Sequence, residues 1–179
     1  MSVNGYVGRP NGELDWMTWN WDDKIKDYVN KLHEPVDTIL LGRKMTEGFI
    51  THWTTVKPDD PSFEFAKKMV DTPKVVFTKT LTESSWVNTV LAKGDLAQEI
   101  QKLKNQNGGD IIVYGGASFV SSLIKENLID DYQLFVNPAA ISSGLTIFGE
   151  VPGKMDLSLI KSLSFDCGIV LLHYEPKKL

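Results

Sequence analysis

The chain has 179 residues, of which 42% are hydrophobic and 23% charged, and its formal net charge is -4 at pH 7. This length is enough for one domain with a sizeable core, and we expect residues 1–179 to form a single domain. The chain lacks a long basic stripe, which argues against nucleic acid as the main partner. No apolar run reaches the roughly 18–20 residues of a membrane span, so no membrane partner is expected.

The chain has one cysteine, Cys167, which excludes an internal disulfide and a CxxC metal site. The N-terminus lacks a signal-peptide core, so a reducing, cytoplasmic location is the simplest expectation. The three histidines, His33, His52 and His173, lie far apart in sequence and lack metal-ligand spacing. The sequence therefore predicts no metal site.

The spacing of apolar residues predicts helices and strands that alternate up to about residue 130, after which strands dominate. The elements are, in chain order, the tail of a strand at 2–7, a helix at 22–32, a strand at 38–41, helices at 44–50 and 62–70, strands at 74–77 and 86–91, a helix at 95–105, a strand at 111–114, a helix at 117–126, and strands at 132–136, 157–163 and 169–174. This order predicts an α/β fold with three layers, α/β/α, and a mostly parallel sheet with an antiparallel edge at its C-terminal end.

Residues 111–119, Ile-Ile-Val-Tyr-Gly-Gly-Ala-Ser-Phe, form the most informative stretch. They predict a buried strand, a tight Gly-Gly turn and the start of a helix. Such a turn lets the backbone approach a phosphate and directs the free N–H groups of a helix at it. An ordinary strand-to-helix turn has the same pattern, so these residues alone leave both interpretations open.

Three predicted strands end in residues suited to binding an anion. These residues are Gly42-Arg43, Thr78-Lys79 and Gly115-Gly116. In open α/β sheets, ligands bind beyond the carboxyl ends of the strands. Arg43 and Lys79 could hold a phosphate and the Thr78 hydroxyl could donate to it, although each cation alone also fits a solvated loop charge.

The same segments, in the same order, resemble the dihydrofolate reductase-like superfamily. The closer similarity is to its branch that contains the C-terminal reductase domain of bifunctional riboflavin-biosynthesis enzymes. Ser-Val-Asn-Gly-Tyr-Val at 2–7 resembles the opening motif of that branch, and Gly-Glu-Leu-Asp-Trp at 12–16 its first-loop motif. The similarity continues through Gly42–Glu47, the two later strand ends, Leu128–Asp131, Pro138, Gly144 and Leu145–Phe148. It covers nearly the whole chain.

The resemblance implies an NADPH-binding reductase that transfers a hydride from the nicotinamide ring to a C=N or C=O bond. By position, the phosphates of the cofactor would meet Gly42, Arg43 and Lys44, and its 2′-phosphate would meet Arg43, Thr78 and Lys79. The pyrophosphate would lie against Gly115, Gly116, Ala117, Ser118 and Phe119, and the covering loop would contain Gly8.

The resemblance also implies a substrate side. Tyr114 would lie beside the nicotinamide pocket, Phe49 would line the substrate side, and Asp15 and Trp16 would lie near the mouth. Asp15 is the candidate catalytic residue, either orienting substrate or relaying a proton through water; a turn-forming aspartate is the alternative. Trp16 and its neighbouring tryptophans either stack on a flat ring or anchor the loop on the core.

The chain departs from the family pattern at positions that matter. The family normally has a full apolar strand before the opening motif, where this chain starts, so either that strand is shortened or upstream residues are absent from this sequence. Asn4 also replaces a common aspartate. Dihydrofolate reductases carry a buried carboxylate on the first helix, and the nearest residues here, Asp22 and Asp23, fit better as helix-start residues. Dihydrofolate is therefore a doubtful substrate.

The sequence thus predicts an NADPH-dependent reductase of a small heterocyclic or pyrimidine-derived substrate, resembling 5-amino-6-(5-phosphoribosylamino)uracil reductase of riboflavin biosynthesis. The alternatives are a dihydrofolate reductase and a nucleotide-binding module without turnover. Because the riboflavin-type branch commonly forms dimers, the expected assembly is a homodimer.

Overall fold

A computed structural model describes residues 1–177 of the chain. The chain divides into two compact units, one formed by Asn30–Phe119 and the other by Met1–Val29 together with the chain from Val120 onward. We call them the parallel-sheet unit and the antiparallel-sheet unit, and describe each by itself.

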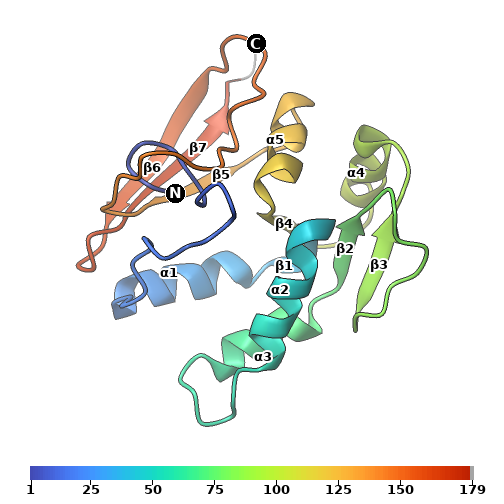
Figure 1. Ribbon diagram of the computed structural model, residues 1–179, viewed down its shortest axis with the longest axis horizontal. Coiled ribbons are helices and arrows are strands. Elements are labelled where there is room, and N and C mark those ends of the chain that lie inside the picture. Colours follow the sequence, from blue (N-terminus) through green and yellow to red (C-terminus); the bar gives the residue numbers. More distant parts are fainter. Residues whose placement is uncertain (178–179) are drawn as a thin grey trace. The chain divides into compact units, whose positions relative to one another are not determined.

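The parallel-sheet unit contains a four-stranded sheet of order β3-β2-β1-β4, in which every neighbouring pair is parallel (Figure 1). The strands are β1 (Val36–Gly42), β2 (Lys74–Phe77), β3 (Thr89–Ala92) and β4 (Asp110–Gly115). The helices between them are α2 (Arg43–Thr54), α3 (Phe63–Asp71) and α4 (Leu96–Lys104).

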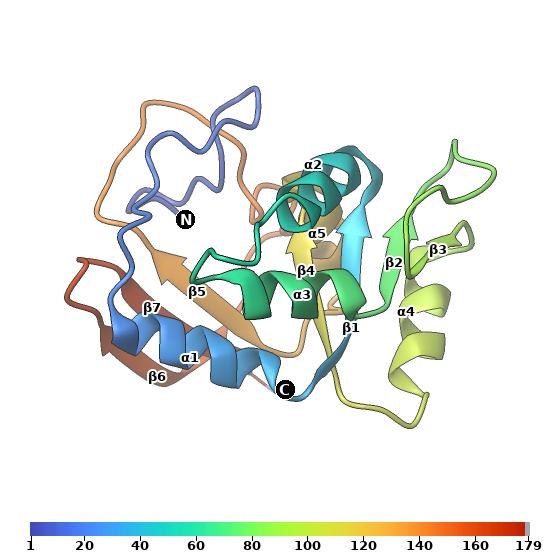
Figure 2. The same cartoon turned by 90° about the horizontal axis from the view of Figure 1, so that it is seen from below.

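The core of this unit joins α2 and α3 to one face of the sheet (Figure 2). Its buried members are Ile39, Leu41, Phe49, Met69 and Val76. Side chains alternate between the faces of a strand, so Ile39 and Leu41 share this face. The strands are apolar on both faces, as expected for a parallel sheet covered by helices on both sides.

The antiparallel-sheet unit contains a three-stranded sheet of order β5-β7-β6. The strands are β5 (Tyr132–Val136), β6 (Leu157–Ser164) and β7 (Val170–Pro176). Tyr28, on helix α1 (Asp23–His33), packs edge-on against Phe135 and Phe165. Helix α5 (Ala117–Lys125) begins in the parallel-sheet unit and contributes its buried Leu123 and Ile124 here.

The predicted fold class is confirmed: a mostly parallel sheet, a smaller antiparallel one and helices on both sides. The antiparallel strands form a sheet of their own, and the third strand begins at Thr89, three residues later than predicted. The prediction of a strand tail at residues 2–7 was wrong, because the chain turns there: the Ser2 N–H donates to the Tyr6 carbonyl at 2.7 Å, and Gly5 has φ +88°. Within residues 1–177, no helix is long and apolar enough to cross a membrane.

Candidate cofactor site

The carboxyl ends of β1, β2 and β4 meet at one edge of the parallel sheet. The register places Gly42 beside Phe77 of β2 and Leu41 beside Gly115 of β4. The three predicted strand ends are therefore neighbours in space. At this edge β1 continues directly into α2, β2 continues into Thr78-Lys79, and β4 continues into the Gly-Gly turn.

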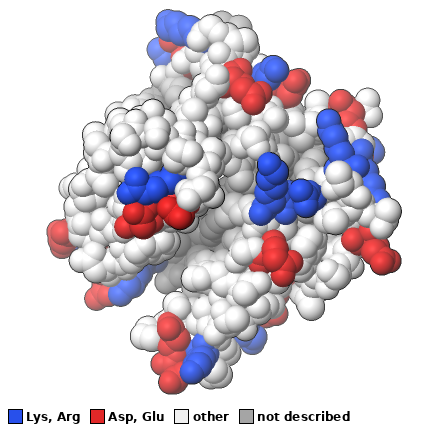
Figure 3. Space-filling view, viewed as in Figure 1, with Lys and Arg blue, Asp and Glu red and all other residues white. Residues whose placement is uncertain are grey.

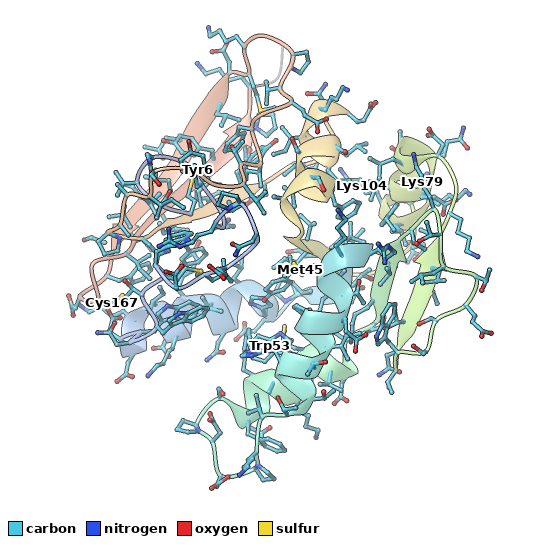
Figure 4. The ribbon with its side chains drawn as sticks, in the orientation of Figure 1. Tyr6, Met45, Trp53, Lys79, Lys104 and Cys167 are labelled. Carbon is cyan, nitrogen blue, oxygen red and sulfur yellow. The ribbon has the colours of Figure 1, made fainter. Side chains whose placement is uncertain are left out.

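Glycine is needed where these turns approach each other. A Cβ atom on Gly42 would lie 2.9 Å from the Cβ of Phe119 and 3.2 Å from the Gly116 nitrogen. Gly115 has φ +132°, a conformation that L side chains rarely adopt, and a Cβ there would lie 2.8 Å from the Met45 sulfur on α2. Figure 4 labels Met45 near the start of this helix.

Gly116 differs from the other two glycines, because a Cβ built on it would have no atom within 4 Å. Open space therefore lies directly beside the backbone at the start of α5. A flat or charged group could approach the Gly116 backbone without meeting a side chain. This is the geometry that phosphate-binding turns at helix N-termini require.

The start of α2 is also suited to an anion. Its N-cap residue is Gly42, no side chain caps it, and its first turn contains no acidic residue. The start of α4 is different, because the Asp95 carboxylate accepts a hydrogen bond from the Gln98 N–H. A carboxylate at that position would repel a phosphate. The helix whose N-terminus favours an anion is thus α2 rather than α4.

Exposed cations surround this edge. Arg43 and Lys44 are exposed on the first turn of α2, and Lys79 is exposed after β2. Figure 3 shows basic side chains over the part of the surface where Figure 1 draws the start of α2, and Figure 4 shows Lys79 beyond the end of β2. The exposed cations and the first backbone N–H groups of α2, which no side chain caps, therefore favour a ligand carrying several phosphate oxygens.

Thr78 lies at the same edge and is buried. Its hydroxyl oxygen accepts hydrogen bonds from the backbone N–H groups of Thr80 at 3.2 Å and Leu81 at 3.1 Å. These bonds fix the turn that exposes Lys79. Because the hydroxyl acts as an acceptor in both, its own proton remains available as a donor.

Tyr114 and Phe49 pack together in the core of the parallel-sheet unit, with their ring centroids 5.1 Å apart. The Tyr114 hydroxyl forms a hydrogen bond with Nε2 of His33, which is 3% exposed. Burial raises the pKa of Tyr114, so its phenol stays protonated. This histidine partner was not predicted; the two residues are 81 positions apart, and no local pattern pairs them.

Three predicted site residues, Gly8, Asp15 and Trp16, belong to the antiparallel-sheet unit. Asp15 forms a two-point ion pair with Arg9, at 2.6 and 2.9 Å. Hydrogen bonding to Arg9 lowers the pKa of Asp15, which keeps the carboxylate ionised. In this state it can orient a substrate or a water molecule, but it has no proton of its own to donate.

Trp16 and Gly8 have their own features within this unit. Among the described residues, the indole Nε1 of Trp16 is a buried nitrogen that has no hydrogen-bond acceptor. The Gly8 carbonyl accepts a hydrogen bond from the Leu145 N–H at 2.8 Å, which joins the first loop to the segment before β6. The loop around Trp16 is therefore anchored and also carries an unsatisfied donor.

The Asp22 side chain caps the start of α1. One of its carboxylate oxygens accepts from the Ile25 N–H and the other from the Cys167 N–H, each at 3.0 Å. These backbone hydrogen bonds lower the pKa of Asp22. Asp23 is exposed and pairs with Lys26. Both residues thus behave as helix-start residues, which is the interpretation that the sequence favoured over a buried carboxylate.

The geometry can be compared with known proteins. The family model for the RibD C-terminal domain matches residues 1–171. The chain belongs to this family. A RibD C-terminal domain therefore spans nearly the whole chain.

Individual relatives support the same grouping. The chain is 28% identical over 175 residues to the uncharacterized protein YyaP of Bacillus subtilis, covering 98% of this chain and 90% of YyaP. A putative riboflavin biosynthesis protein from Shewanella sp. PV-4 superposes with a TM-score of 0.77 at 24% identity, covering 99% of this chain and 96% of the other. Dihydrofolate reductase from Enterococcus faecalis, complexed with NADP(H), superposes with a TM-score of 0.60 at 16% identity, covering 99% and 93%. The fold is therefore dihydrofolate reductase-like.

Proposed function

We propose that this protein is an NADPH-dependent reductase. The observation that carries the proposal is the carboxyl edge of the parallel sheet, where the uncapped start of α2 and the open space beside Gly116 adjoin. The residues at this edge fit a dinucleotide, because they offer backbone N–H groups, exposed cations and no carboxylate in the first turn of α2. Membership in the RibD C-terminal domain family supports the same function.

In this proposal each part of the edge has a separate task. Gly42 and Gly116 allow the pyrophosphate to approach the backbone at the starts of α2 and α5, with Ala117, Ser118 and Phe119 completing the turn. Arg43, Thr78 and Lys79 hold the 2′-phosphate, and Lys44 adds positive charge. When bound, the nicotinamide supplies a hydride to a C=N or C=O bond.

The remaining predicted residues orient the substrate. Phe49 and Tyr114 provide a rigid aromatic support, since His33 holds the Tyr114 hydroxyl. Asp15, kept ionised by Arg9, orients the substrate or a proton-carrying water molecule. Trp16, whose indole nitrogen is buried, offers its ring to stack on a flat substrate, and Gly8 belongs to the covering loop.

The proposed substrate is a small heterocyclic compound of the pyrimidine class, as in the riboflavin-biosynthesis branch. The use of Asp22 as a helix cap supports this choice over dihydrofolate, because both of its carboxylate oxygens are engaged by backbone N–H groups. We also propose a cytoplasmic location and a homodimer. Light scattering coupled to gel filtration tests the assembly, and a monomer at all concentrations would contradict it.

The cofactor is tested by comparing NADPH with NADH in calorimetry or tryptophan fluorescence quenching. The unmodified chain should bind NADPH more tightly. Arg43→Ala should weaken NADPH tenfold or more and NADH much less, because only NADPH carries the 2′-phosphate. Lys57→Ala, in the exposed loop after α2, is the matched control and should change neither. Equal losses for both cofactors in Arg43→Ala would refute the 2′-phosphate assignment.

Turnover is tested by following NADPH oxidation with pyrimidine-derived substrates and with dihydrofolate. Oxidation with the pyrimidine class alone supports the proposal. Turnover of dihydrofolate that falls severely in Asp22→Asn would instead favour a dihydrofolate reductase. Tight NADPH binding with no turnover of any substrate would indicate a nucleotide-binding module.

A further inference from the structure

We propose that Asp131, His173 and Glu175 form a binding site for a divalent transition-metal ion of the Zn²⁺ class. One ligand atom from each of these residues lies within 4.8 Å of the other two. The site belongs to the antiparallel-sheet unit and is independent of the proposed reductase function. Among the described residues, this is the group of three histidine and acidic side chains that converges in this way.

Strand pairing brings the three side chains together. Gln133 of β5 pairs with His173 of β7, and Tyr132 pairs with Tyr174. Extending this register by one residue places Asp131 opposite Glu175. His173 and Glu175 are two residues apart on one strand, so they point to the same face. Two of the ligands therefore lie on β7, and the third directly precedes the first residue of β5.

The arrangement brings two carboxylates close together. Like charges directly opposite each other on neighbouring strands destabilise a sheet. A cation between Asp131 and Glu175 removes this repulsion, and His173 supplies a neutral nitrogen to complete the set. Mixed imidazole and carboxylate ligands suit Zn²⁺ and similar first-row metals better than Ca²⁺ or Mg²⁺, which prefer oxygen ligands alone. Three protein ligands leave a position for water.

Neighbouring groups orient the first ligand. The Gln133 side-chain Nε2 donates to Oδ1 of Asp131 at 2.6 Å, and the Tyr28 hydroxyl donates to the side-chain Oε1 of Gln133 at 2.8 Å. The other Asp131 oxygen lies 2.7 Å from Nε2 of His173. Such outer partners fix the orientation of metal-ligating carboxylates. The hydrogen bond between Asp131 and His173 has to open when a metal binds between them.

One basic group lies near the site. Lys161 of β6 pairs with His173 in the register and places its ammonium 5.6 Å from the centre of the Tyr28 ring. The attraction of this ammonium to the ring gives it a partner away from the three ligands. The alternative to metal binding is a plain ion pair between a protonated His173 and the carboxylates, and the experiment separates the two.

The test is a Zn²⁺ titration of the full chain by calorimetry, repeated with Co²⁺ and monitored by visible absorption. We expect one Zn²⁺ per chain and a Co²⁺ spectrum typical of nitrogen and oxygen ligands. His173→Ala and Glu175→Gln should each weaken binding tenfold or more. His52→Ala, which removes an exposed histidine from α2 in the other unit, is the control and should bind as the unmodified chain does.

A second measurement, of the melting temperature, distinguishes a loss of metal binding from a variant that has failed to fold. Zn²⁺ should raise the melting temperature of the unmodified chain and of His52→Ala, because it binds only the folded state, and should leave that of Glu175→Gln unchanged. Absence of stoichiometric Zn²⁺ binding overturns the proposal. Equal binding by all four proteins also overturns it, since the metal would then bind elsewhere on the surface.

Discussion

A Cβ atom on Gly42 would lie 2.9 Å from the Cβ of Phe119. The start of α2 and the start of α5 are therefore so close together that a side chain larger than that of glycine does not fit between them. Both helices begin at the carboxyl edge of the parallel sheet. This close approach is what puts two helix N-termini within reach of one ligand.

Gly42→Ala is expected to destabilise the protein by about 1–3 kcal/mol, because the added methyl group forces Phe119 or the Gly116 backbone to move. NADPH binding should weaken as well. Gly48→Ala on the same helix is the matched control: its Cβ would meet no atom within 4 Å, and it should stabilise the protein by roughly 0.5–1 kcal/mol. Urea unfolding measures both, and an equal effect of the two substitutions would contradict the close approach.

Gly116→Ala should separate binding from folding. Because a Cβ there meets no protein atom within 4 Å, the melting temperature should stay close to that of the unmodified chain. The methyl group would fill the space proposed for the cofactor, so NADPH affinity should fall tenfold or more. Calorimetry and thermal unfolding on the same sample give both values. Unchanged affinity would show that the ligand does not approach the backbone here.

The Arg9–Asp15 pair predicts a change in the pH dependence of turnover. Hydrogen bonding to Arg9 lowers the pKa of Asp15, so in the unmodified chain the carboxylate stays ionised as the pH falls through the mildly acidic range. Arg9→Ala removes this effect and raises the pKa, and the acidic limb of the rate profile should move to higher pH. Asp15→Asn should lower kcat without changing the melting temperature. If Asp15 only forms a turn, neither substitution will alter the profile.

Lys74 predicts a pH dependence of stability. Its ammonium donates to the carbonyls of Met69, Val70 and Thr72 at the end of α3, and desolvation by burial lowers its pKa to about 8. The unfolded chain keeps the ordinary, higher pKa, so above pH 8 it binds more protons than the folded chain. The free energy of unfolding should therefore rise between pH 8 and 9.5, by about 1–2 kcal/mol.

Lys74→Met provides the reference for this measurement, because it removes the titrating group and keeps an apolar stem. Urea unfolding at pH 7, 8 and 9.5 should show the rise in the unmodified chain relative to Lys74→Met. Parallel curves for the two proteins would show that the ammonium titrates normally in the folded state.

Most elements could be predicted because their signals are local. The apolar spacing in α1 and the buried run of β2 depend only on neighbouring residues, and the structure has both where the sequence predicted them. The meeting of the three strand ends was also predictable, since parallel strands bring their carboxyl ends to one edge. The periodicity of apolar residues thus predicts the helices, the strands and the edge of the sheet at which a ligand would bind.

Contacts between distant residues could not be predicted in the same way. His33 reaches Tyr114, and His173 reaches Asp131, across 81 and 42 residues of sequence. Asn4 shows a subtler case: its amide donates to the Ile141 carbonyl at 2.7 Å and accepts from the Ile141 N–H at 3.2 Å. An aspartate could not donate that first bond. A side-chain hydrogen bond from the Tyr6 N–H to the Ser2 hydroxyl oxygen, at 2.9 Å, also helps to hold residues 2–7 in a turn.

The division of the chain into Asn30–Phe119 and the segments that flank it has a consequence for biosynthesis. The parallel-sheet unit is one continuous stretch, so all of its strands and helices are synthesised before β5, β6 and β7. In the other unit, the N-terminal segment cannot pack against β5, β6 and β7 until these strands have been made, and the last of them ends at Pro176. We expect the newly made chain to acquire its parallel sheet first, leaving Met1–Val29 exposed to proteases and chaperones until β7 has been made.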